Sequence, residues 1–138
     1  MIYLDASALL RVLFDEPGPR VPLGPGAVAF SSRLIEVESH RAVDRARLLR
    51  RLSDGQTARK KRELEQAFAM LALVPVDDAV LDLAKVSFPV NVRALDAIHV
   101  ATAQHMQAQV GPVEFWTHAP RQANAALARG LDVRGVEA

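Results

Sequence analysis

Short apolar runs alternate with longer amphipathic stretches along most of this chain, which predicts β-strands alternating with α-helices. Strands that alternate with helices favour a three-layer α/β/α fold around a mostly parallel sheet of about four to five strands. The predicted strands are residues 1–4, 27–30, 73–76, 113–117 and 131–133. The predicted helices are residues 6–14, a helix capped by Ser31 or Ser32 that runs to about 52, residues 57–71, a helix capped by Asp77 or Asp78 that runs to about 86, residues 96–109 and residues 120–129.

Residues 15–26 interrupt this pattern. They contain four prolines and three glycines in twelve residues, so they cannot continue the preceding helix and are predicted to form a loop. A chain of 138 residues is long enough to bury one core, and we expect a single domain over residues 1–138.

The amino-acid composition excludes several classes of functional site. The chain has no cysteine, which excludes disulfides, thiolate zinc sites and cysteine nucleophiles. No apolar stretch approaches the roughly 20 residues that a membrane helix needs. Because the opening apolar run is typical of a strand and not of a signal peptide, we expect a cytoplasmic protein without a membrane contact.

Charge is segregated along the chain although the net charge is only +1. Of seventeen basic and sixteen acidic residues, nine basic and two acidic ones lie in residues 41–62, so this segment carries +7 and the remainder −6. A basic region beside an acidic remainder favours a polyanionic partner such as RNA. The alternative is a solvated helical face with no binding role.

Three acidic residues, Asp5, Glu38 and Asp96, occupy places where separate segments could converge. Carboxylates gathered without cationic partners repel one another, and a divalent metal ion is the usual way to hold them together. Asp5 and Asp96 also have a structural alternative, because each lies at a predicted helix start and could cap it, with Ser7 competing for the cap beside Asp5.

Glu38 stands out from Glu36 by its position on the predicted helix. At about 100° per residue, Glu38 falls on one stripe with the apolar Leu34, Leu48, Leu49 and Leu52, whereas Glu36 falls on the far side. A carboxylate directed toward an apolar face needs a partner. That partner could be a metal ion, or it could be Arg41 or Arg45 in a salt bridge; Arg41 could instead meet a substrate phosphate.

His99 follows Asp96 by about one helical turn, and Asp-x-x-His could ligate a metal ion. A lone histidine on an apolar helix is more often packed and hydrogen-bonded, and we expect that role for His99. The other histidines have no recognisable ligand spacing, so no zinc site is expected.

Three segments in this order resemble the PIN-domain family, specifically the VapC-like toxins of bacterial toxin–antitoxin pairs. Residues 2–9 read Ile-Tyr-Leu-Asp-Ala-Ser-Ala-Leu, and residues 31–38 read Ser-Ser-Arg-Leu-Ile-Glu-Val-Glu with an arginine three positions later. Residues 95–103 read Leu-Asp-Ala-Ile-His-Val-Ala-Thr-Ala, which is the most specific of the three. Residues 125–133 also fit the family's ending, so the resemblance covers nearly the whole chain.

The resemblance implies an endoribonuclease that depends on Mg²⁺ or Mn²⁺ and hydrolyses RNA with a metal-activated water. It implies transfer or ribosomal RNA as the target, a small cognate antitoxin as the protein partner, and a homodimer. The residues it implies for metal binding and catalysis are Asp5, Glu38 and Asp96, and those for substrate binding or support are Ser7, Arg41 and Thr117.

The chain departs from this family at two places. Where the family usually carries a fourth acid, the sequence reads Thr117-His118-Ala119, and the lost carboxylate could impair the enzyme. One alternative is therefore a degenerate PIN domain that binds RNA or an antitoxin without cutting; another is an unrelated α/β protein whose acids are caps and salt bridges. The second departure is the loop at residues 15–26, where relatives often have another helical turn.

Overall fold

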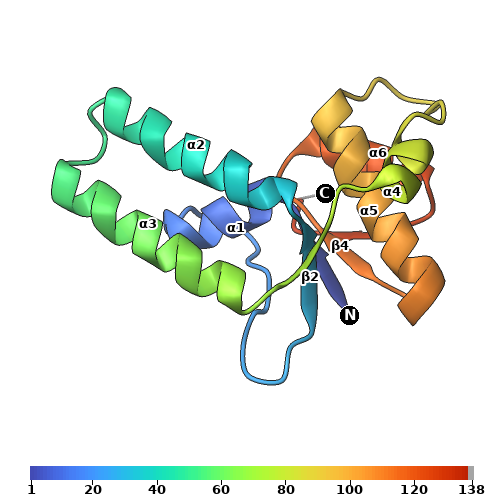
Figure 1. Ribbon diagram of the computed structural model, residues 1–138, viewed down its shortest axis with the longest axis horizontal. Helices are drawn as coiled ribbons and strands as arrows, with labels where there is room; N and C mark the ends of the chain where they lie inside the picture. The colour runs from blue at the N-terminus through green and yellow to red at the C-terminus, as the bar shows by residue number, and fades with distance from the viewer. Residues whose placement is uncertain (137–138) are drawn as a thin grey trace.

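A computed structural model describes residues 1–136, which form a five-stranded parallel sheet between two layers of helices (Figure 1). This confirms the predicted three-layer α/β/α fold. The strands are β1 (Ile2–Leu4), β2 (Ala29–Ser32), β3 (Ala72–Val74), β4 (Glu114–Trp116) and β5 (Asp132–Arg134). The helices are α1 (Ala6–Leu13), α2 (Leu34–Leu48), α3 (Asp54–Ala69), α4 (Asp78–Ala84), α5 (Ala94–Val110) and α6 (Pro120–Ala128).

The strand order β3-β2-β1-β4-β5 places the first strand at the centre of the sheet. Tyr3 of β1 pairs with Phe30 of β2 on one side and with Phe115 of β4 on the other. All neighbouring strands are parallel, so their carboxyl ends share one edge, where sites in such sheets usually lie. Asp5 and Thr117 directly follow β1 and β4 and therefore meet at this edge.

Alternate residues of β1 enter two separate cores, because successive side chains of a strand point to opposite faces. Ile2 and Leu4 pack with α1, α2 and α3, where Ile35 and Leu64 are fully buried. Tyr3 packs on the other face with α5 and α6. Burial on both faces explains why every residue of β1 is apolar or aromatic.

The second strand and its following helix begin later than the sequence pattern predicted. Ser31 and Ser32 are the last residues of β2 and are fully buried, although the Ser32 hydroxyl still accepts a hydrogen bond from the Leu34 N–H at 3.1 Å. The predicted helix end near residue 52 is also wrong, because α2 ends at Leu48. Packing on α1 and α3 buries the stripe of Ile35, Ser39 and Val43, so the predicted stripe was misplaced.

Helix α3 begins three residues before its predicted start. Ser53 caps it and forms a reciprocal pair with Gln56, in which each side chain binds the other's backbone N–H. Arg50 adopts a left-handed backbone conformation (φ 58°) and helps reverse the chain between α2 and α3. Asp77 caps α4 as one of the two predicted alternatives. The two helices α2 and α3 lie antiparallel and extend beyond the sheet as an arm (Figure 1).

Residues 15–26 contain neither helix nor strand, as predicted. Within residues 1–136, no helix combines the length and apolarity needed to cross a membrane.

Candidate active site

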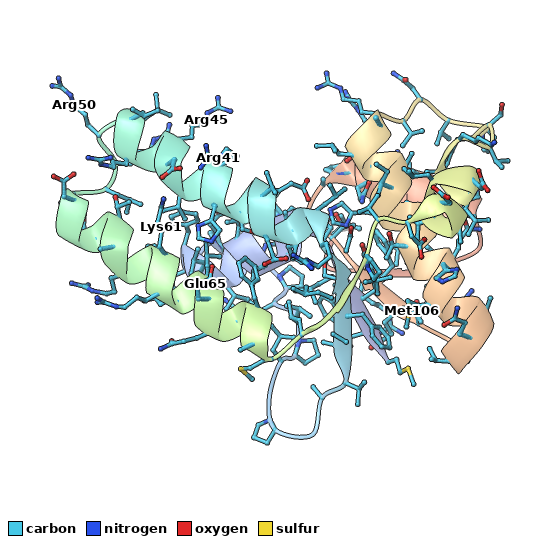
Figure 2. The ribbon with its side chains drawn as sticks, in the orientation of Figure 1. Arg41, Arg45, Arg50, Lys61, Glu65 and Met106 are labelled. Atoms are coloured by element: carbon cyan, nitrogen blue, oxygen red, sulfur yellow. The ribbon has the colours of Figure 1, made fainter. Side chains whose placement is uncertain are left out.

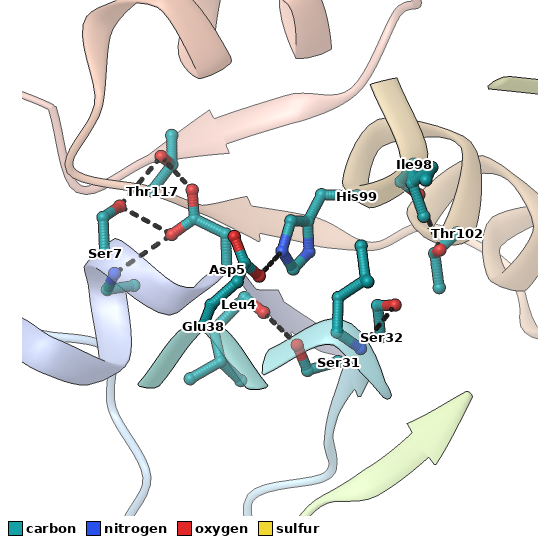
Figure 3. A network of polar contacts seen from close by, with 12 residues as sticks. Leu4, Asp5, Ser7, Ser31, Ser32, Glu38, Ile98, His99, Thr102 and Thr117 are labelled. Atoms are coloured by element: carbon teal, nitrogen blue, oxygen red, sulfur yellow. Dashed lines mark hydrogen bonds and ion pairs between the residues drawn. The ribbon is translucent and has the colours of Figure 1, made fainter. Parts of the chain in front are cut away.

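Asp5 is the most enclosed acid at the carboxyl edge of the sheet, with 4% of its surface exposed. It caps α1, because its Oδ1 atom accepts a hydrogen bond from the Ala8 N–H at 3.0 Å. The same oxygen accepts from the Ser7 hydroxyl at 2.6 Å, and Oδ2 accepts from the Thr117 hydroxyl at 2.5 Å (Figure 3). Ser7 therefore supports Asp5 and does not compete with it for the cap.

Two hydroxyls connect Asp5 to the segment after β4. The Ser7 oxygen accepts a hydrogen bond from the His118 N–H at 2.8 Å, and the Thr117 oxygen accepts from the Ala119 N–H at 3.1 Å. The two hydroxyls lie 3.2 Å apart. Because each hydroxyl both donates and accepts, the position of Asp5 is tied to the backbone of residues 117–119.

Burial raises the pKa of the Asp5 carboxyl above its ordinary value. The nearby His99 and the hydrogen bonds from Ser7, Thr117 and Ala8 favour the ionised form, but they offset burial only in part. A carboxylate in this state gains more than an exposed one from a nearby cation.

Glu38 finds its partner on another helix. Its Oε1 atom lies 2.6 Å from the Nε2 atom of His99, which is buried on α5 (Figure 3). The expected alternatives, Arg41 and Arg45, do not fill this role: Arg41 pairs with Asp44 at 2.6 Å. The Glu38 side chain is 24% exposed, so it lies at the margin of the core with one side open.

Tyr3 completes this chain of contacts from the central strand. Its hydroxyl lies 2.6 Å from His99 Nδ1 and accepts a hydrogen bond from the Ser32 N–H at 3.2 Å. Burial raises the pKa of the Tyr3 phenol well above its ordinary value, so the phenol keeps its proton. With a neutral imidazole, Tyr3 donates to Nδ1, and the Nε2–H of His99 donates to Glu38.

Asp96 lies in the first turn of α5 and not at its cap, since α5 begins at Ala94 after an Arg93 that makes no side-chain cap bond. Burial raises the pKa of the Asp96 carboxyl, and Asp5 and Glu38 raise it further, while His99 and Arg121 act in the opposite direction. Asp96 therefore lies close enough to Asp5 and Glu38 for their charges to act on it.

Gln122 is a buried neighbour of Asp96 that sequence analysis missed. With its amide nitrogen turned toward Asp96, it donates to the Asp96 side chain at 3.2 Å and to the Asp96 carbonyl oxygen at 3.3 Å. Gln122 holds Asp96 from α6, one turn after Ala119. No sequence motif marked this residue, because the contact joins two helices.

Asp5, Glu38 and Asp96 lie near one another but do not form a complete set of ligands for one metal ion. Within residues 1–136, no three histidine, aspartate or glutamate side chains are grouped closely enough to hold one ion. Carboxylate oxygens are nevertheless the donors that Mg²⁺ and Mn²⁺ prefer, and Mg²⁺ commonly takes only one or two carboxylates and keeps several waters. Asp5 and Asp96, both with raised pKa, fit such an ion, and Glu38 is engaged with His99.

The basic segment forms much of the surface of the α2–α3 arm. Arg45 projects into solvent from α2 and Arg50 from the turn that follows it, whereas Lys61 lies between α2 and α3 (Figure 2). Lys61 and Arg41 both bind Asp44, and Arg47 binds Asp54. Among the residues that the structure describes, the basic residues of this arm without an ion pair are Arg45, Arg50, Arg51, Arg59 and Arg62.

A protein-family model described as the PIN domain matches residues 2–110 of this chain. Two similar proteins come from Mycobacterium tuberculosis. Ribonuclease VapC46 of strain ATCC 25618 / H37Rv is 37% identical over 133 residues, which is 96% of this chain and 95% of that protein. Ribonuclease VapC47 of strain CDC 1551 / Oshkosh is 32% identical over 125 residues, covering 86% of this chain and 85% of that protein.

A solved structure shares the fold. The toxin–antitoxin complex from Klebsiella pneumoniae contains a chain that matches with a TM-score of 0.58 at 12% identity, covering 97% of this chain and 96% of that one. At this identity the likeness concerns the arrangement of strands and helices alone.

Proposed function

This chain belongs to the PIN-domain family and is VapC-like along nearly its whole length, and from that premise we propose that it is a metal-dependent endoribonuclease, the toxin of a toxin–antitoxin pair. Two relatives carry the name ribonuclease. The observation that carries the proposal is the pair of neighbouring acids Asp5 and Asp96, both with pKa values raised by burial. Perturbed carboxylates that face one space are typical of a functional site.

Asp5 and Asp96 are the proposed metal-binding residues, with Glu38 as a third acid. A bound Mg²⁺ or Mn²⁺ would lower the pKa of a water molecule and neutralise charge on the scissile phosphate. Ser7 and Thr117 hold both oxygens of Asp5 in place through their hydroxyls, and Gln122 holds Asp96. Pre-positioned carboxylates need no rearrangement when substrate binds.

Glu38 is the proposed general base. His99 binds its Oε1 atom, which leaves Oε2 to accept a proton from the attacking water. This assignment gives the buried His99 a defined task, because an imidazole fixed by Tyr3 holds the carboxylate in one orientation.

RNA is the proposed substrate, with transfer or ribosomal RNA as the first candidates, and the cytoplasm is the proposed compartment. The exposed arginines of the α2–α3 arm, including Arg45 and Arg50, would bind flanking phosphates. Arg41 remains a candidate for the same role, since its side chain is 70% exposed even while it pairs with Asp44. A small cognate antitoxin and a second copy of the chain are the proposed protein partners.

The test uses purified protein, freed of any partner, with total transfer and ribosomal RNA in Mn²⁺, Mg²⁺ or EDTA. Asp96→Asn is the matched variant, because it keeps the size of the side chain and removes its charge. Discrete fragments that disappear with EDTA and with the variant would support the proposal. Intact RNA in every arm, from folded protein that still binds RNA, would favour the degenerate domain, with Ala119 as the cause.

A further inference from the structure

A depression lies between α1 and α6. Its volume is about 530 Å³, within the range of small-ligand pockets. Its lining includes Arg11, Pro17, His118, Pro120, Asn124 and Leu127.

Two hydrogen bonds connect a residue that lines this depression, His118, to Asp5. The N–H of His118 donates to Ser7 at 2.8 Å, and Ser7 donates to Asp5 at 2.6 Å. Ser7 and Arg11 are four residues apart on α1, so they lie on the same face of the helix. A polymer with one phosphate at Asp5 would therefore bring an adjacent unit over the depression.

Arg11 gives the depression an uncompensated positive charge. Only 3% of this residue is exposed, and its Nη1 atom donates to two neutral carbonyl oxygens, those of Pro19 at 2.6 Å and Gly135 at 2.8 Å. Its Nε atom has no hydrogen-bond partner, and no carboxylate within residues 1–136 pairs with the guanidinium. A buried charge in this state favours an electron-rich ligand.

The loop at residues 15–26 packs on Arg11. A Cβ atom at Gly18 would lie 2.9 Å from the Arg11 Cζ atom, so the glycine backbone packs directly on the guanidinium. This contact and the Arg11–Pro19 hydrogen bond fix the path of the loop at Gly18 and Pro19. Pro17 is thereby held at the rim of the depression.

The walls combine flat apolar surfaces with one exposed amide. Pro17, Pro120 and Leu127 are apolar, and His118 adds an exposed aromatic ring. Asn124 is exposed and carries both a donor and an acceptor, the pair that can bind the edge of a base. Stacking surfaces beside such an amide suit a nucleobase better than they suit a bare phosphate.

We infer that this depression is a base-binding subsite, which takes the nucleobase of an RNA residue next to the scissile phosphodiester and contributes to the choice of cleavage position. This inference rests on the proposed function, because it takes the substrate to be RNA.

The experiment maps preference on a single-stranded RNA of randomised sequence in two arms. In the first, the products formed in Mn²⁺ are sequenced to find the base preference at each position around the cut. In the second, RNA retained by the protein in EDTA is sequenced, so that a preference can be measured even if no cleavage occurs. Asn124→Ala and His118→Ala are compared with the wild type, and Asn91→Ala is the control, since Asn91 is an exposed asparagine of a different loop.

The expected result is a preference at one position that falls about tenfold in both Asn124→Ala and His118→Ala and is unchanged in Asn91→Ala. A wild type without any positional preference would overturn the inference, as would a preference that both subsite variants retain. Selective binding in EDTA without products in Mn²⁺ would uphold the subsite and refute cleavage, which separates the two proposals.

Discussion

The Nε2 atom of His99 lies 2.6 Å from the Oε1 atom of Glu38, so a buried histidine of α5 is the direct partner of an acid on α2. Tyr3 of the central strand binds the other ring nitrogen. The orientation of Glu38 is therefore set by two residues that lie 35 and 61 positions away from it in the sequence.

Replacing His99 by Leu should lower kcat for RNA cleavage by about 10- to 100-fold, in the range of other residues that orient a metal-site acid. His99→Gln should recover part of this loss, because its amide can still donate to Glu38. Steady-state kinetics that separate kcat from KM provide the measurement. A KM effect alone, or no recovery with Gln, would refute an orienting role.

Tyr3→Phe tests the same chain of contacts through stability. The phenyl ring keeps the stacking of Tyr3 on Phe115, but the buried His99 Nδ1 and the Ser32 N–H lose their shared partner. Each buried polar group left unsatisfied costs about 1–3 kcal/mol, so we expect a loss of that order in the free energy of unfolding. A denaturation midpoint equal to that of the wild type would contradict the hydrogen-bond assignment.

Asp5→Asn should change the dependence of stability on pH in EDTA. Burial raises the folded-state pKa of Asp5 above its unfolded value of about 3.9, so between these values the folded state binds more protons. The stabilisation from this group is present at low pH and is lost as the pH rises through the folded pKa. The Tm of the variant relative to wild type should therefore increase from about pH 4 to about pH 7.

Asp132→Asn should change the pH dependence of Tm in the opposite direction to Asp5→Asn. Arg134 lowers the pKa of the exposed Asp132 carboxyl through a hydrogen bond and its charge, so this group stabilises the fold at neutral pH and loses that effect in acid. The relative Tm of this variant should fall as the pH rises. Parallel slopes for the two variants would show that the Asp5 pKa is not raised.

Gly135→Ala should destabilise the protein more than Gly130→Ala does. Both glycines have positive φ angles, 95° and 76°, which cost an L residue about 1–2 kcal/mol. Only at Gly135 would the new Cβ also meet backbone, at 2.6 Å from the Thr117 carbonyl oxygen; at Gly130 it would meet nothing within 4 Å. Denaturant unfolding measures the difference, and equal losses would show that Thr117 moves aside freely.

Ala119→Asp should increase the Tm shift caused by Mn²⁺, since it adds a carboxylate after β4. Ala119 precedes α6 without any side-chain cap bond, so Asp and Asn should both stabilise the helix by about 0.5–1 kcal/mol. Ala119→Asn is therefore the matched control for capping, and only the Asp variant should bind Mn²⁺ more tightly. Equal Mn²⁺ shifts in the two variants would mean that residue 119 does not face the ion.

The strand and helix order and the loop could be predicted from the sequence, because each depends on local composition or periodicity. The assignment of the three acids to one catalytic site stays a prediction. Side-chain partners could not be predicted in this way. Periodicity suggested Arg41 or Arg45 for Glu38, since those residues share its helix, whereas the actual partner lies on α5. Contacts between helices depend on how the helices pack on the sheet. The sequence pattern of one helix does not contain that information.

The misplaced stripe on α2 has a different cause. Leu48 and Leu49 look like core residues by hydropathy, yet they are 80% and 52% exposed. They lie at the C-terminal end of α2. This end of the α2–α3 arm extends beyond the sheet (Figure 1). The periodicity of a helix does not show where the sheet beneath it ends. Apolar residues at a projecting helix end are therefore easily mistaken for core residues.

The central place of the first strand has a consequence for biosynthesis. Asp5 is made more than a hundred residues before its partner Thr117, and the strand β4, which pairs with β1, is also made much later. A nascent chain therefore carries an incomplete sheet with an open edge where β4 will later insert. The hydrogen bond that holds Asp5 Oδ2 therefore cannot form until the segment after β4 has been made, so the acidic site is completed only after its three acids have already been synthesised.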